Sequence, residues 1–205
     1  MARTAVVLAT RNAHKLEELQ RILVETGLDV ELIGLDAFPD LDDIVEDGET
    51  FAANALLKAR AAAAATSLPA VADDSGLCVD ALGGMPGVRS ARWAGVHGDD
   101  AANVELLLRQ IADVPDGRRG ARFVCAAVVA TPRGAERVEE GQLDGSVVWE
   151  PRGTNGFGYD PIFLPAGERR TTAEMPAAEK DAISHRGRAL RALAPLVGEL
   201  LYGGG

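Results

Sequence analysis

Two neighbouring aspartates, Asp73 and Asp74, follow the apolar residues 70–72 and precede Ser75. Adjacent carboxylates repel each other, and their ionised forms are costly inside a fold unless cations or hydrogen-bond donors lie close by. A hard divalent cation such as Mg²⁺ binds carboxylate oxygens and would meet that need. Side chains alternate along a strand, so only one of the two aspartates has to face a site. An acidic turn closed by an Asx-type hydrogen bond is the alternative.

Three polar residues, Thr10, Asn12 and Lys15, stand where the apolar run of residues 3–9 gives way to the amphipathic segment 13–26. The start of a helix presents unpaired backbone N–H groups and the positive end of the helix dipole, which together attract anions. Thr10 and Asn12 can donate hydrogen bonds to a phosphate there, and Lys15 can supply a positive charge. Simple capping by Thr10 or Asn12, with a solvated Lys15, is the alternative. The segment lacks the glycine-rich P-loop pattern.

An acidic loop before the second amphipathic segment offers further oxygen ligands. It contains Glu46, Asp47 and Glu49, any of which could complete a metal site. Most acids in such a run are solvated, so we expect two of these three at the surface. Asn54 and Lys58 follow four residues apart, which puts them on one helical face. Lys58 can reach a phosphate from there as easily as it can reach solvent.

The segment GTNGFGYDPIF combines glycines with aromatic residues. Glycines let the backbone approach a ligand closely, and Phe157 and Tyr159 offer flat faces on which a base could stack. Asp160 precedes Pro161, which favours an extended conformation for Asp160. A tight loop or β-bulge with its aromatic rings packed in the core is the alternative.

A cluster of hydrogen-bond donors occurs near the C-terminus, in the segment EKDAISHRG. Lys180, Ser184, His185 and Arg186 lie at the predicted boundary of the last helix. Such donors suit the recognition of carbonyl or phosphate oxygens, and arginine can bind them in a bidentate manner. Favourable placement of positive charge near helix ends is the alternative.

The elements that must position these residues alternate between strands and helices. Apolar and periodic segments predict strands at residues 3–9, 29–34 and 70–73, and helices at 13–26 and 50–66, 99–113, 172–182 and 187–201. Thr50 is a typical N-cap. The segments ARFVCAAVVATP and RVEEGQLDGSVVW predict a hairpin through the turn TPRGAE. This order predicts an α/β fold with a mixed central sheet flanked by helices. Without a repeat or a linker, we expect one domain, residues 1–205, with two lobes and an active-site cleft between them.

The composition excludes several classes of function. A net charge of -10 argues against a nucleic-acid polymer as partner, because such binding needs many phosphate contacts by lysine and arginine. A small anion can still bind where local cations or a metal reverse the field. Cys78 and Cys125 lie in apolar runs without metal-ligand spacing, so we expect reduced core cysteines. We find no secretory signal and no run long enough to cross a membrane, which favours a cytoplasmic protein.

Five segments, TRNAHK, DDSGL, GGMPGVRSARWAG, FGYDPIF and EKDAISHRG, occur in an order and spacing typical of one enzyme family. On these motifs, from Val6 to the C-terminal helix, the chain resembles the inosine/xanthosine triphosphate pyrophosphatases, which remove altered purine nucleotides from the nucleotide pool. The resemblance implies a two-lobed mixed α/β fold and a homodimer. It also implies Mg²⁺-dependent hydrolysis of dITP, ITP and XTP to the nucleoside monophosphate and pyrophosphate.

The resemblance further implies a role for each matching residue. Asp74 would be the general base and a Mg²⁺ ligand, Glu46 would be the second ligand, and Lys58 would be a catalytic residue near the phosphates. The substrate would be bound by Thr10, Arg11, Asn12, Ala13, His14 and Lys15, among which Thr10, Asn12 and Lys15 would hold the triphosphate. The residues lining the nucleoside pocket would be Ser75, Phe157, Gly158, Tyr159, Asp160, Lys180, His185 and Arg186. One departure is Ala53, which stands where the family commonly has an acidic residue.

Two other functions fit the same residues. A related pyrophosphatase for modified pyrimidine or methylated nucleotides would share the metal and phosphate chemistry but would need a different base pocket. A nucleotide-binding regulatory protein would hold its ligand without hydrolysing it. The adjacent carboxylates favour catalysis, because binding alone seldom requires an acid beside the metal.

Overall fold

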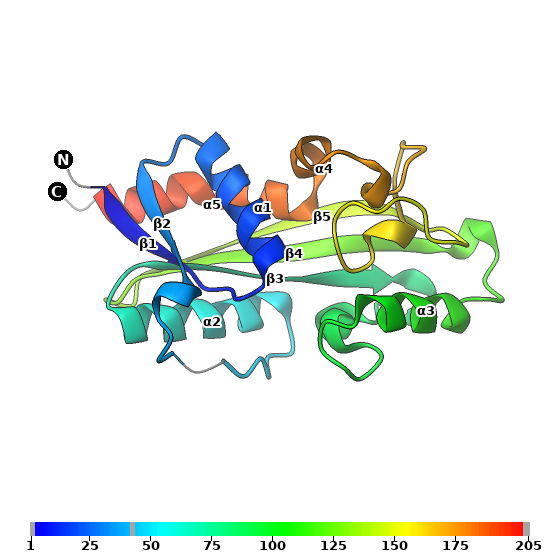
Figure 1. The fold of residues 1–205 in the computed structure, drawn as a ribbon, viewed down its shortest axis with the longest axis horizontal. Coiled ribbons are helices and arrows are strands. Elements are labelled where there is room, and N and C mark those ends of the chain that lie inside the picture. The colour runs from blue at the N-terminus through cyan, green and yellow to red at the C-terminus, as the bar shows by residue number, and fades with distance from the viewer. Residues whose placement is uncertain (1–2, 42–43, 203–205) are drawn as a thin grey trace. The chain divides into compact units, whose positions relative to one another are not determined.

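The computed structural model describes residues 3–41 and 44–202 of the 205-residue chain. Its strands form a six-stranded sheet, in which the order of neighbours is β2 (Val30–Gly34), β1 (Thr4–Leu8), β3 (Ala70–Val79), β4 (Gly120–Ala130), β5 (Glu136–Val147) and β6 (Phe163–Pro165) (Figure 1). Parallel and antiparallel pairs both occur, so the sheet is mixed, and helices flank it. The α/β class predicted from the sequence is therefore confirmed.

The chain divides into two compact units. The first is formed by Met1–Asp74, Cys125–Gly141 and Arg186–Gly205, and the second by Ser75–Val124 and Gln142–His185. The strands β3, β4 and β5 each contribute residues to both units. The expectation of one domain with a cleft between two lobes stays a prediction.

In the first unit, β1 pairs in parallel with both β2 and β3. The helices α1 (Ala13–Glu25) and α5 (His185–Tyr202) pack on one face of these strands, and α2 (Phe51–Thr66) packs on the opposite face (Figure 1). Side chains alternate along β3, so Val71 joins the apolar cluster with α1 and α5 while Ala72 joins the cluster with α2. The next two residues, Asp73 and Asp74, continue this alternation.

The helices of the first unit begin where the sequence predicts. Asn12 caps α1, and the Thr50 hydroxyl accepts a hydrogen bond from the N–H of Ala53 at 3.1 Å to cap α2. The buried side of α2 consists of small side chains, among them Ala55 and Ala59, which are fully buried. Small side chains let this helix approach the sheet closely, which brings its polar residues near β3.

In the second unit, one apolar cluster joins β3, β4, β5 and β6 to α3 (Asp100–Gln110). Leu77 and Val79 of β3 and Leu107 of α3 are fully buried in it. The strands β5 and β6 pair antiparallel. The short helix α4 (Ala177–Ile183) completes the helices of this unit.

Several boundaries differ from the sequence prediction, among them the end of the predicted helix 99–113, since α3 ends at Gln110. β3 does not end at residue 73 but continues to Val79, because Leu77 and Val79 alternate into the core beyond the two aspartates. The predicted helix 172–182 is a 3₁₀ turn, Thr172–Glu174, followed by α4, since Pro176 lacks the N–H that a continuous helix requires. Finally, α5 begins at His185 rather than at residue 187.

Most of the other predictions at this level are confirmed, and the burial of Cys78 is the exception. β4 and β5 are neighbours joined by a turn in which the N–H of Thr131 donates to the carbonyl of Ala135 at 2.9 Å. Both cysteines are free; Cys125 is buried as expected, whereas Cys78 is only half-buried. In the part of the chain that the structure describes, no helix combines the length and the apolar character needed to cross a bilayer.

Candidate functional site

Asp74 lies on the face of β3 that packs against α2, and two side chains of α2 approach it. The Asn54 amide donates a hydrogen bond to Asp74 Oδ2 at 3.0 Å, and Lys58 Nζ lies 3.8 Å from Asp74 Oδ1. The same Nζ lies 3.0 Å from Glu46 Oε1. We call Glu46, Asn54, Lys58 and Asp74 the Asp74 cluster. It is a nearly buried arrangement of two carboxylates around one ammonium group.

Asn54 ties the acidic loop to Asp74. It is fully buried, and its Oδ1 accepts the N–H of Gly48 at 2.8 Å while its Nδ2 donates to Asp74. A Cβ atom on Gly48 would lie 2.6 Å from Asn54 Oδ1, so this close approach requires glycine. Asn54 therefore fixes both the Asp74 carboxylate and the end of the loop.

The three loop acids that the sequence left open have different surroundings. Glu46 forms an ion pair with Lys58, whereas Asp47 and Glu49 are exposed. This difference favours Glu46 as the loop acid of the site. Ala53, at the position where the resemblance leads one to expect an acid, is half-buried on α2.

Burial and charge set the proton affinities of the Asp74 cluster. Burial raises the pKa of Asp74, and the positive charges of Lys58 and Lys15 offset only part of that effect. Burial alone would lower the pKa of Lys58, but the carboxylates around it, with that of Asp74 first, outweigh burial and raise the pKa. Asp74 is therefore a stronger base than an exposed aspartate, and Lys58 is a cation at neutral pH.

Asp73 faces the opposite side of β3, toward α1 and α5. Arg186 Nε donates to Asp73 Oδ2 at 3.0 Å, and Lys15 Nζ lies 3.3 Å from the same oxygen. The Arg186 guanidinium also donates to Glu18 of α1. Burial by itself would raise the pKa of Asp73, but Lys15 and Arg186 outweigh it and hold that pKa far below its usual range. We call Lys15, Glu18, Asp73 and Arg186 the Asp73 network.

The start of α1 shows the capping role that the sequence left open. Asn12 Oδ1 accepts the N–H of Lys15 at 3.1 Å, and Thr10 Oγ1 accepts the N–H of Asn12 at 3.2 Å. Lys15 is paired with Asp73 instead of being solvated. The remaining residues of this segment, Arg11, Ala13 and His14, are exposed. The helix start thus offers exposed backbone and a nearby ammonium group, which is an arrangement that attracts anions.

The donor set of the Asp74 cluster fits a magnesium ion. In proteins, Mg²⁺ usually takes one or two carboxylates together with water and substrate phosphates. Glu46 and Asp74 both approach the Lys58 ammonium, so a positive charge is already accommodated between these carboxylates. Within residues 3–41 and 44–202, no three or more His, Cys, Asp or Glu side chains gather as a metal cage. A metal held jointly by two carboxylates and a substrate therefore suits these residues.

In the second unit, Asp160 organises the glycine loop, which we define as residues 153–160. Its Oδ2 accepts hydrogen bonds from the Phe157 N–H at 2.9 Å and from Lys180 Nζ at 2.6 Å. Its Oδ1 accepts one from the Thr172 hydroxyl at 2.8 Å. Lys180 Nζ lies 5.0 Å from the centroid of the Phe157 ring, within cation–π range. The structure therefore brings Phe157, Asp160 and Lys180 together, as a base pocket would require.

The two aromatic residues of the glycine loop differ. Tyr159 belongs to the core of the second unit, is 4% exposed, and donates its hydroxyl to the Ser90 carbonyl at 3.0 Å. This placement matches the alternative in which an aromatic ring packs inside. Phe157 is half-buried, so it is the ring better placed to meet a ligand.

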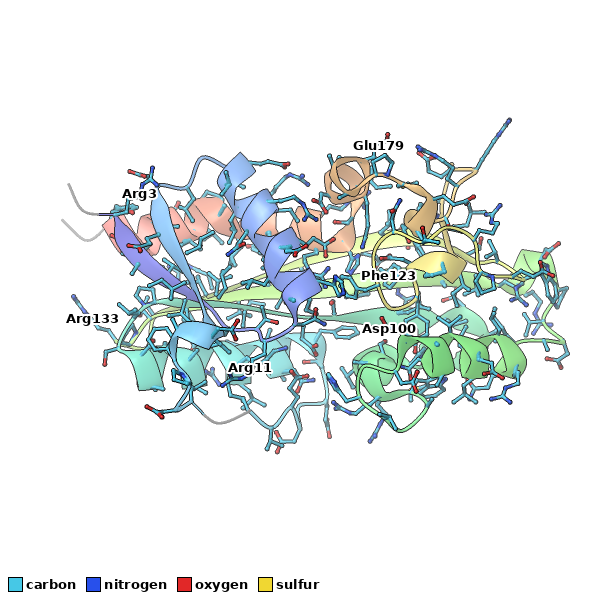
Figure 2. All side chains as sticks on the ribbon, in the orientation of Figure 1. Arg3, Arg11, Asp100, Phe123, Arg133 and Glu179 are labelled. Atoms are coloured by element: carbon cyan, nitrogen blue, oxygen red, sulfur yellow. The ribbon has the colours of Figure 1, made fainter. Side chains whose placement is uncertain are left out.

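Three other nucleoside-pocket candidates, His185, Ser75 and Gly158, belong to the second unit. His185 is buried, and its ring stacks on Phe123 with a centroid distance of 4.7 Å and an interplanar angle of 10°. Figure 2 labels Phe123 on β4. Ser75, on β3, and Gly158 are half-buried.

Sequence reasoning did not single out Glu18. It is 2% exposed, although it follows Glu17 in a helix whose polar positions are expected to face water. Its partner, Arg186, lies 168 positions later in the chain. No local sequence pattern predicts a pair so far apart in the chain. Asn54 did share a helical face with Lys58 in the sequence, and that spacing was the available signal for its role.

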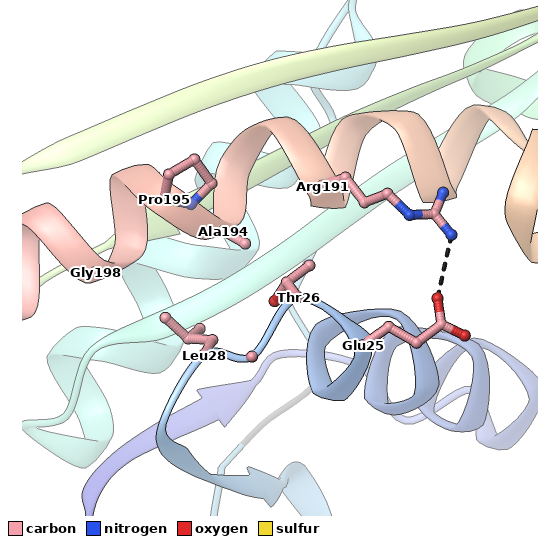
Figure 3. A pocket seen from close by; sticks show the side chains of 8 residues that line it. Glu25, Thr26, Leu28, Arg191, Ala194, Pro195 and Gly198 are labelled. Atoms are coloured by element: carbon pink, nitrogen blue, oxygen red, sulfur yellow. Dashed lines mark hydrogen bonds and ion pairs between the residues drawn. The ribbon is translucent and has the colours of Figure 1, made fainter.

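A separate hollow of about 440 Å³ lies between the C-terminal end of α1 and α5 (Figure 3). It is lined by Glu25, Thr26, Gly27, Leu28, Arg191, Ala194, Pro195 and Gly198. The ion pair between Glu25 and Arg191, at 3.2 Å, spans it. These residues differ from the candidates above and include no pair of carboxylates, so we do not assign the chemistry to this hollow.

Comparisons with known proteins extend over nearly the whole chain. The sequence profile described as the Ham1 family matches residues 6–196. A protein of Streptomyces avermitilis named dITP/XTP pyrophosphatase is 62% identical over 198 residues, which cover 97% of this chain and 99% of that protein. A protein of Frankia alni with the same name is 61% identical over 201 residues, covering 96% and 98%.

Solved structures agree with these matches. A HAM1 protein from Coxiella burnetii superposes with a TM-score of 0.85 at 42% identity, covering 96% of this chain and 99% of that one. A nucleoside-triphosphatase / dITP/XTP pyrophosphatase from Mycobacterium abscessus superposes with a TM-score of 0.76 at 56% identity, covering 94% and 100%. At such identities the likeness extends beyond the fold alone.

Proposed function

Because this chain belongs to the Ham1 family, we propose that it is a nucleoside-triphosphate pyrophosphatase that hydrolyses dITP, ITP and XTP with the help of Mg²⁺. The products are the nucleoside monophosphate and pyrophosphate. The observation that carries the proposal is Asp74, a nearly buried carboxylate of raised pKa that is held by Asn54 beside the Lys58 ammonium. The names of the relatives supply the substrate class.

Asp74 is the proposed general base. It accepts a proton from a water molecule, whose oxygen forms a bond to the α-phosphorus as the bond from that phosphorus to the bridging oxygen breaks. Pyrophosphate leaves with the electron pair of the broken bond. Asn54 supports this role, because its amide fixes the orientation of the carboxylate. The environment of Asp74 favours proton uptake more than that of an exposed aspartate does.

The proposed triphosphate-binding groups are cationic or belong to the start of α1. Lys58 is the proposed catalytic ammonium, since it stays charged and can offset charge that develops on phosphate oxygens. Lys15, Thr10 and Asn12 would bind the phosphates together with the backbone N–H groups at the helix start. Arg11, Ala13 and His14 are exposed on the same segment and would contribute main-chain or peripheral contacts.

Glu46 and Asp74 are the residues that would hold Mg²⁺. When bound, the ion supplies positive charge that neutralises phosphate oxygens during hydrolysis. Both carboxylates approach the Lys58 ammonium, so their arrangement tolerates a cation. A ligand role for Glu46 would also give the acidic loop a function. Asn54 holds that loop by accepting the N–H of Gly48.

The base would bind to the second unit through Phe157, Lys180 and Asp160. A purine could stack on the half-buried Phe157, and Lys180 could donate to the 6-keto oxygen of hypoxanthine or xanthine. Adenine carries an amino group at that position and would leave such a donor unpaired. Ser75, Gly158, Tyr159, His185 and Arg186 complete the proposed pocket, with Tyr159 acting from the core. Donors of the segment His185–Arg186 are the other candidates for the 6-keto oxygen.

Pyrophosphate release from dITP in the presence of Mg²⁺ tests the proposal directly. We expect turnover of dITP, ITP and XTP with specificity constants well above those for dATP, ATP and GTP. A chain that binds dITP without releasing pyrophosphate would instead be a nucleotide-binding regulatory protein. A preference for modified pyrimidine or methylated nucleotides in the same panel would assign it to the related class of pyrophosphatases.

We also propose that the protein is a cytoplasmic homodimer that acts on free nucleotides. Light scattering on the purified full chain measures the oligomeric state. A monomeric mass at the concentrations used in the assay would contradict the dimer but leave the proposed reaction standing.

A further inference from the structure

The carboxylate of Asp100 holds the middle of the glycine loop. Asp100 is the first residue of α3, where Figure 2 labels it, and its Oδ2 accepts the N–H of Gly158 at 2.6 Å. The two residues are 58 positions apart in the sequence. Hydrogen bonds to an ionised acceptor are stronger than those between neutral groups. A negatively charged side chain of the second unit therefore anchors the backbone of the loop that carries Phe157.

Asp100 is not the residue that caps α3. That role belongs to Asp99, whose Oδ1 accepts the N–H of Ala102 at 3.0 Å. Both aspartates place a negative charge near the N-terminus of the helix, where the helix dipole favours it. They differ in what their oxygens accept: Asp99 binds its own helix, and Asp100 binds the glycine loop.

The loop needs such an anchor because its backbone has unusual freedom. Gly153, Gly156 and Gly158 all have positive φ angles, the last at 61°, in a region that glycine adopts at little cost. Asp160 accepts the N–H of Phe157, and Asp100 accepts the N–H of the next residue. Two consecutive peptide groups are thus fixed by two carboxylates from different elements. Their planes determine the direction in which the Phe157 ring projects.

The Phe157 ring is the group whose position depends on this anchor. It lies beside the Lys180 ammonium, which Asp160 holds at 2.6 Å. On the other side of Gly158, the buried Tyr159 ring is fixed by the core, and the Asp100 carboxylate is close enough to contribute, after burial, to the raised pKa of its hydroxyl. Without the carboxylate of Asp100, Gly158 would lose the hydrogen bond that connects it to α3.

We infer that Asp100 is a positioning residue for base recognition, which acts by holding the Gly158 N–H so that the Phe157 ring stays beside Lys180. The inference rests on the proposed function, because it requires a purine base to bind at Phe157. In this proposal Asp100 contacts neither the base nor the phosphates and acts only through the Gly158 N–H. Its loss should therefore weaken ligands that carry a base and leave ligands without a base unaffected.

The test compares Asp100→Ala with Asp99→Ala, which removes the same charge from the neighbouring position. Inhibition of dITP hydrolysis is measured with dIMP, which carries the base, and with inorganic triphosphate, which does not. For Asp100→Ala we expect the inhibition constant of dIMP and the KM for dITP to rise about tenfold, the loss typical of a hydrogen bond to a charged group. The kcat and the inhibition constant of triphosphate should stay unchanged. Asp100→Asn, which keeps an acceptor oxygen, should recover most of the dIMP binding.

The control variant should behave differently. Asp99→Ala removes the cap of α3 and should lower the unfolding midpoint while leaving the ratio of dIMP to triphosphate inhibition as in the wild type. Equal weakening of both inhibitors by Asp100→Ala, or no change in either, would overturn the positioning role. Wild-type protein that releases no pyrophosphate from dITP would refute the proposed function itself. If Asp100→Ala does not fold, Asp100→Leu, which is similar in size to aspartate but accepts no hydrogen bond, is compared with Asp99→Leu by the same criteria.

Discussion

Asp73 and Asp74 are adjacent in the sequence and nearly buried on the same strand, yet they have opposite surroundings. Asp73 faces α1 and α5, where Lys15 and Arg186 hold its pKa far below the usual range. Asp74 faces α2, where burial raises its pKa and the lysines offset that effect only in part. The strand thus carries a carboxylate of lowered pKa, paired with cations, on one face and a carboxylate of raised pKa on the other.

The difference indicates a division of labour between the Asp73 network and the Asp74 cluster. A carboxylate paired with a guanidinium and an ammonium holds its negative charge tightly and accepts protons poorly, so it suits a structural role. A carboxylate held by a neutral amide keeps its orientation but remains basic. In the proposed mechanism, Asp73 therefore stabilises the fold and Asp74 reacts. The variants below test this comparison, and an exposed ion pair outside both regions serves as the control.

The largest effect is expected for Asp74→Asn. Removal of the proposed general base should lower kcat for dITP by roughly 10²–10⁴-fold, while the fold is retained. The asparagine can still accept from Asn54 and no longer buries a charge, so the free energy of unfolding at pH 7 should equal or exceed that of the wild type. Pyrophosphate release and urea unfolding measure the two quantities. Retained turnover would remove Asp74 from the mechanism.

The matching change in the Asp73 network is Arg186→Met. It leaves the carboxylates of Asp73 and Glu18 buried without their guanidinium, and breaking a buried ion pair in this way typically costs about 3–5 kcal/mol. Urea unfolding measures the loss. If Arg186 also contacts the base, the ratio of dITP to dATP turnover will fall as well. A variant as stable as the wild type would contradict the structural role.

Asn54→Ala should sharpen the assignment of Asp74. The variant removes the amide that holds Asp74 Oδ2 and the acceptor of the Gly48 N–H, which should lower the free energy of unfolding by about 1–3 kcal/mol. Turnover should fall as well, because the carboxylate loses its fixed orientation. Comparison of kcat and of urea midpoints with the wild type checks both. A loss of stability with full turnover would show that Asn54 holds only the loop.

The pH dependence of stability should have opposite signs for the two aspartates. The folded-state pKa of Asp73 lies below its unfolded value of about 3.9, so its stabilisation is present above that pH and is lost as the pH falls toward the folded pKa. The gap in unfolding free energy between wild type and Asp73→Asn should therefore be constant near neutrality and shrink in acid.

The reverse applies to Asp74, whose folded-state pKa is raised. Its ionisation costs stability once the pH rises past the unfolded value of about 3.9, and the cost is complete above the folded pKa. The free energy of unfolding of Asp74→Asn should therefore increase relative to that of the wild type as the pH rises from acid toward neutrality. Urea unfolding of the three proteins over a pH series measures both slopes. If the free energies of unfolding of the three proteins changed with pH in the same way, the two aspartates would not have opposite pKa shifts.

The smallest effect is expected for an exposed ion pair outside both regions. Arg60 of α2 lies at 2.6 Å from Glu136 of β5, and the arginine side chain is largely solvent-accessible. Exposed pairs contribute little to stability because water and salt screen them. Arg60→Ala should leave the unfolding midpoint and kcat within experimental error. A large loss would mean that charge removal alone explains the effects of the other variants.

The sequence predicted most of the regular elements. Helical periodicity located α1, Thr50 marked the start of α2, and the turn TPRGAE joined the predicted hairpin. These features depend on neighbours within a few positions, so a local pattern suffices to find them. The predicted end of β3 was wrong, because two buried acids normally interrupt a strand. Here Arg186 donates to Asp73 on one face and the Asn54 amide donates to Asp74 on the other, so the strand continues.

The candidate site shows the same limit. Residue types and spacing selected the pair Asp73 and Asp74 together with Lys58 and Lys15, and the family resemblance singled out Asp74. The spacing of Asn54 and Lys58 on one helical face was also readable. The sequence could not tell which of the two aspartates faces Lys58, because strand alternation allows either. It also could not reveal that Tyr159 packs inside or that Glu18 is buried, since their partners are Ser90 and Arg186.

By itself, the sequence determined the class of the fold and the types of candidate residue: carboxylates, ammonium groups, and a glycine loop with aromatic rings. Only the tertiary structure decided which carboxylate is basic. The proton affinity of a buried group depends on the charges within a few ångströms, and those around Asp73 come from residues 15 and 186, which only folding brings together.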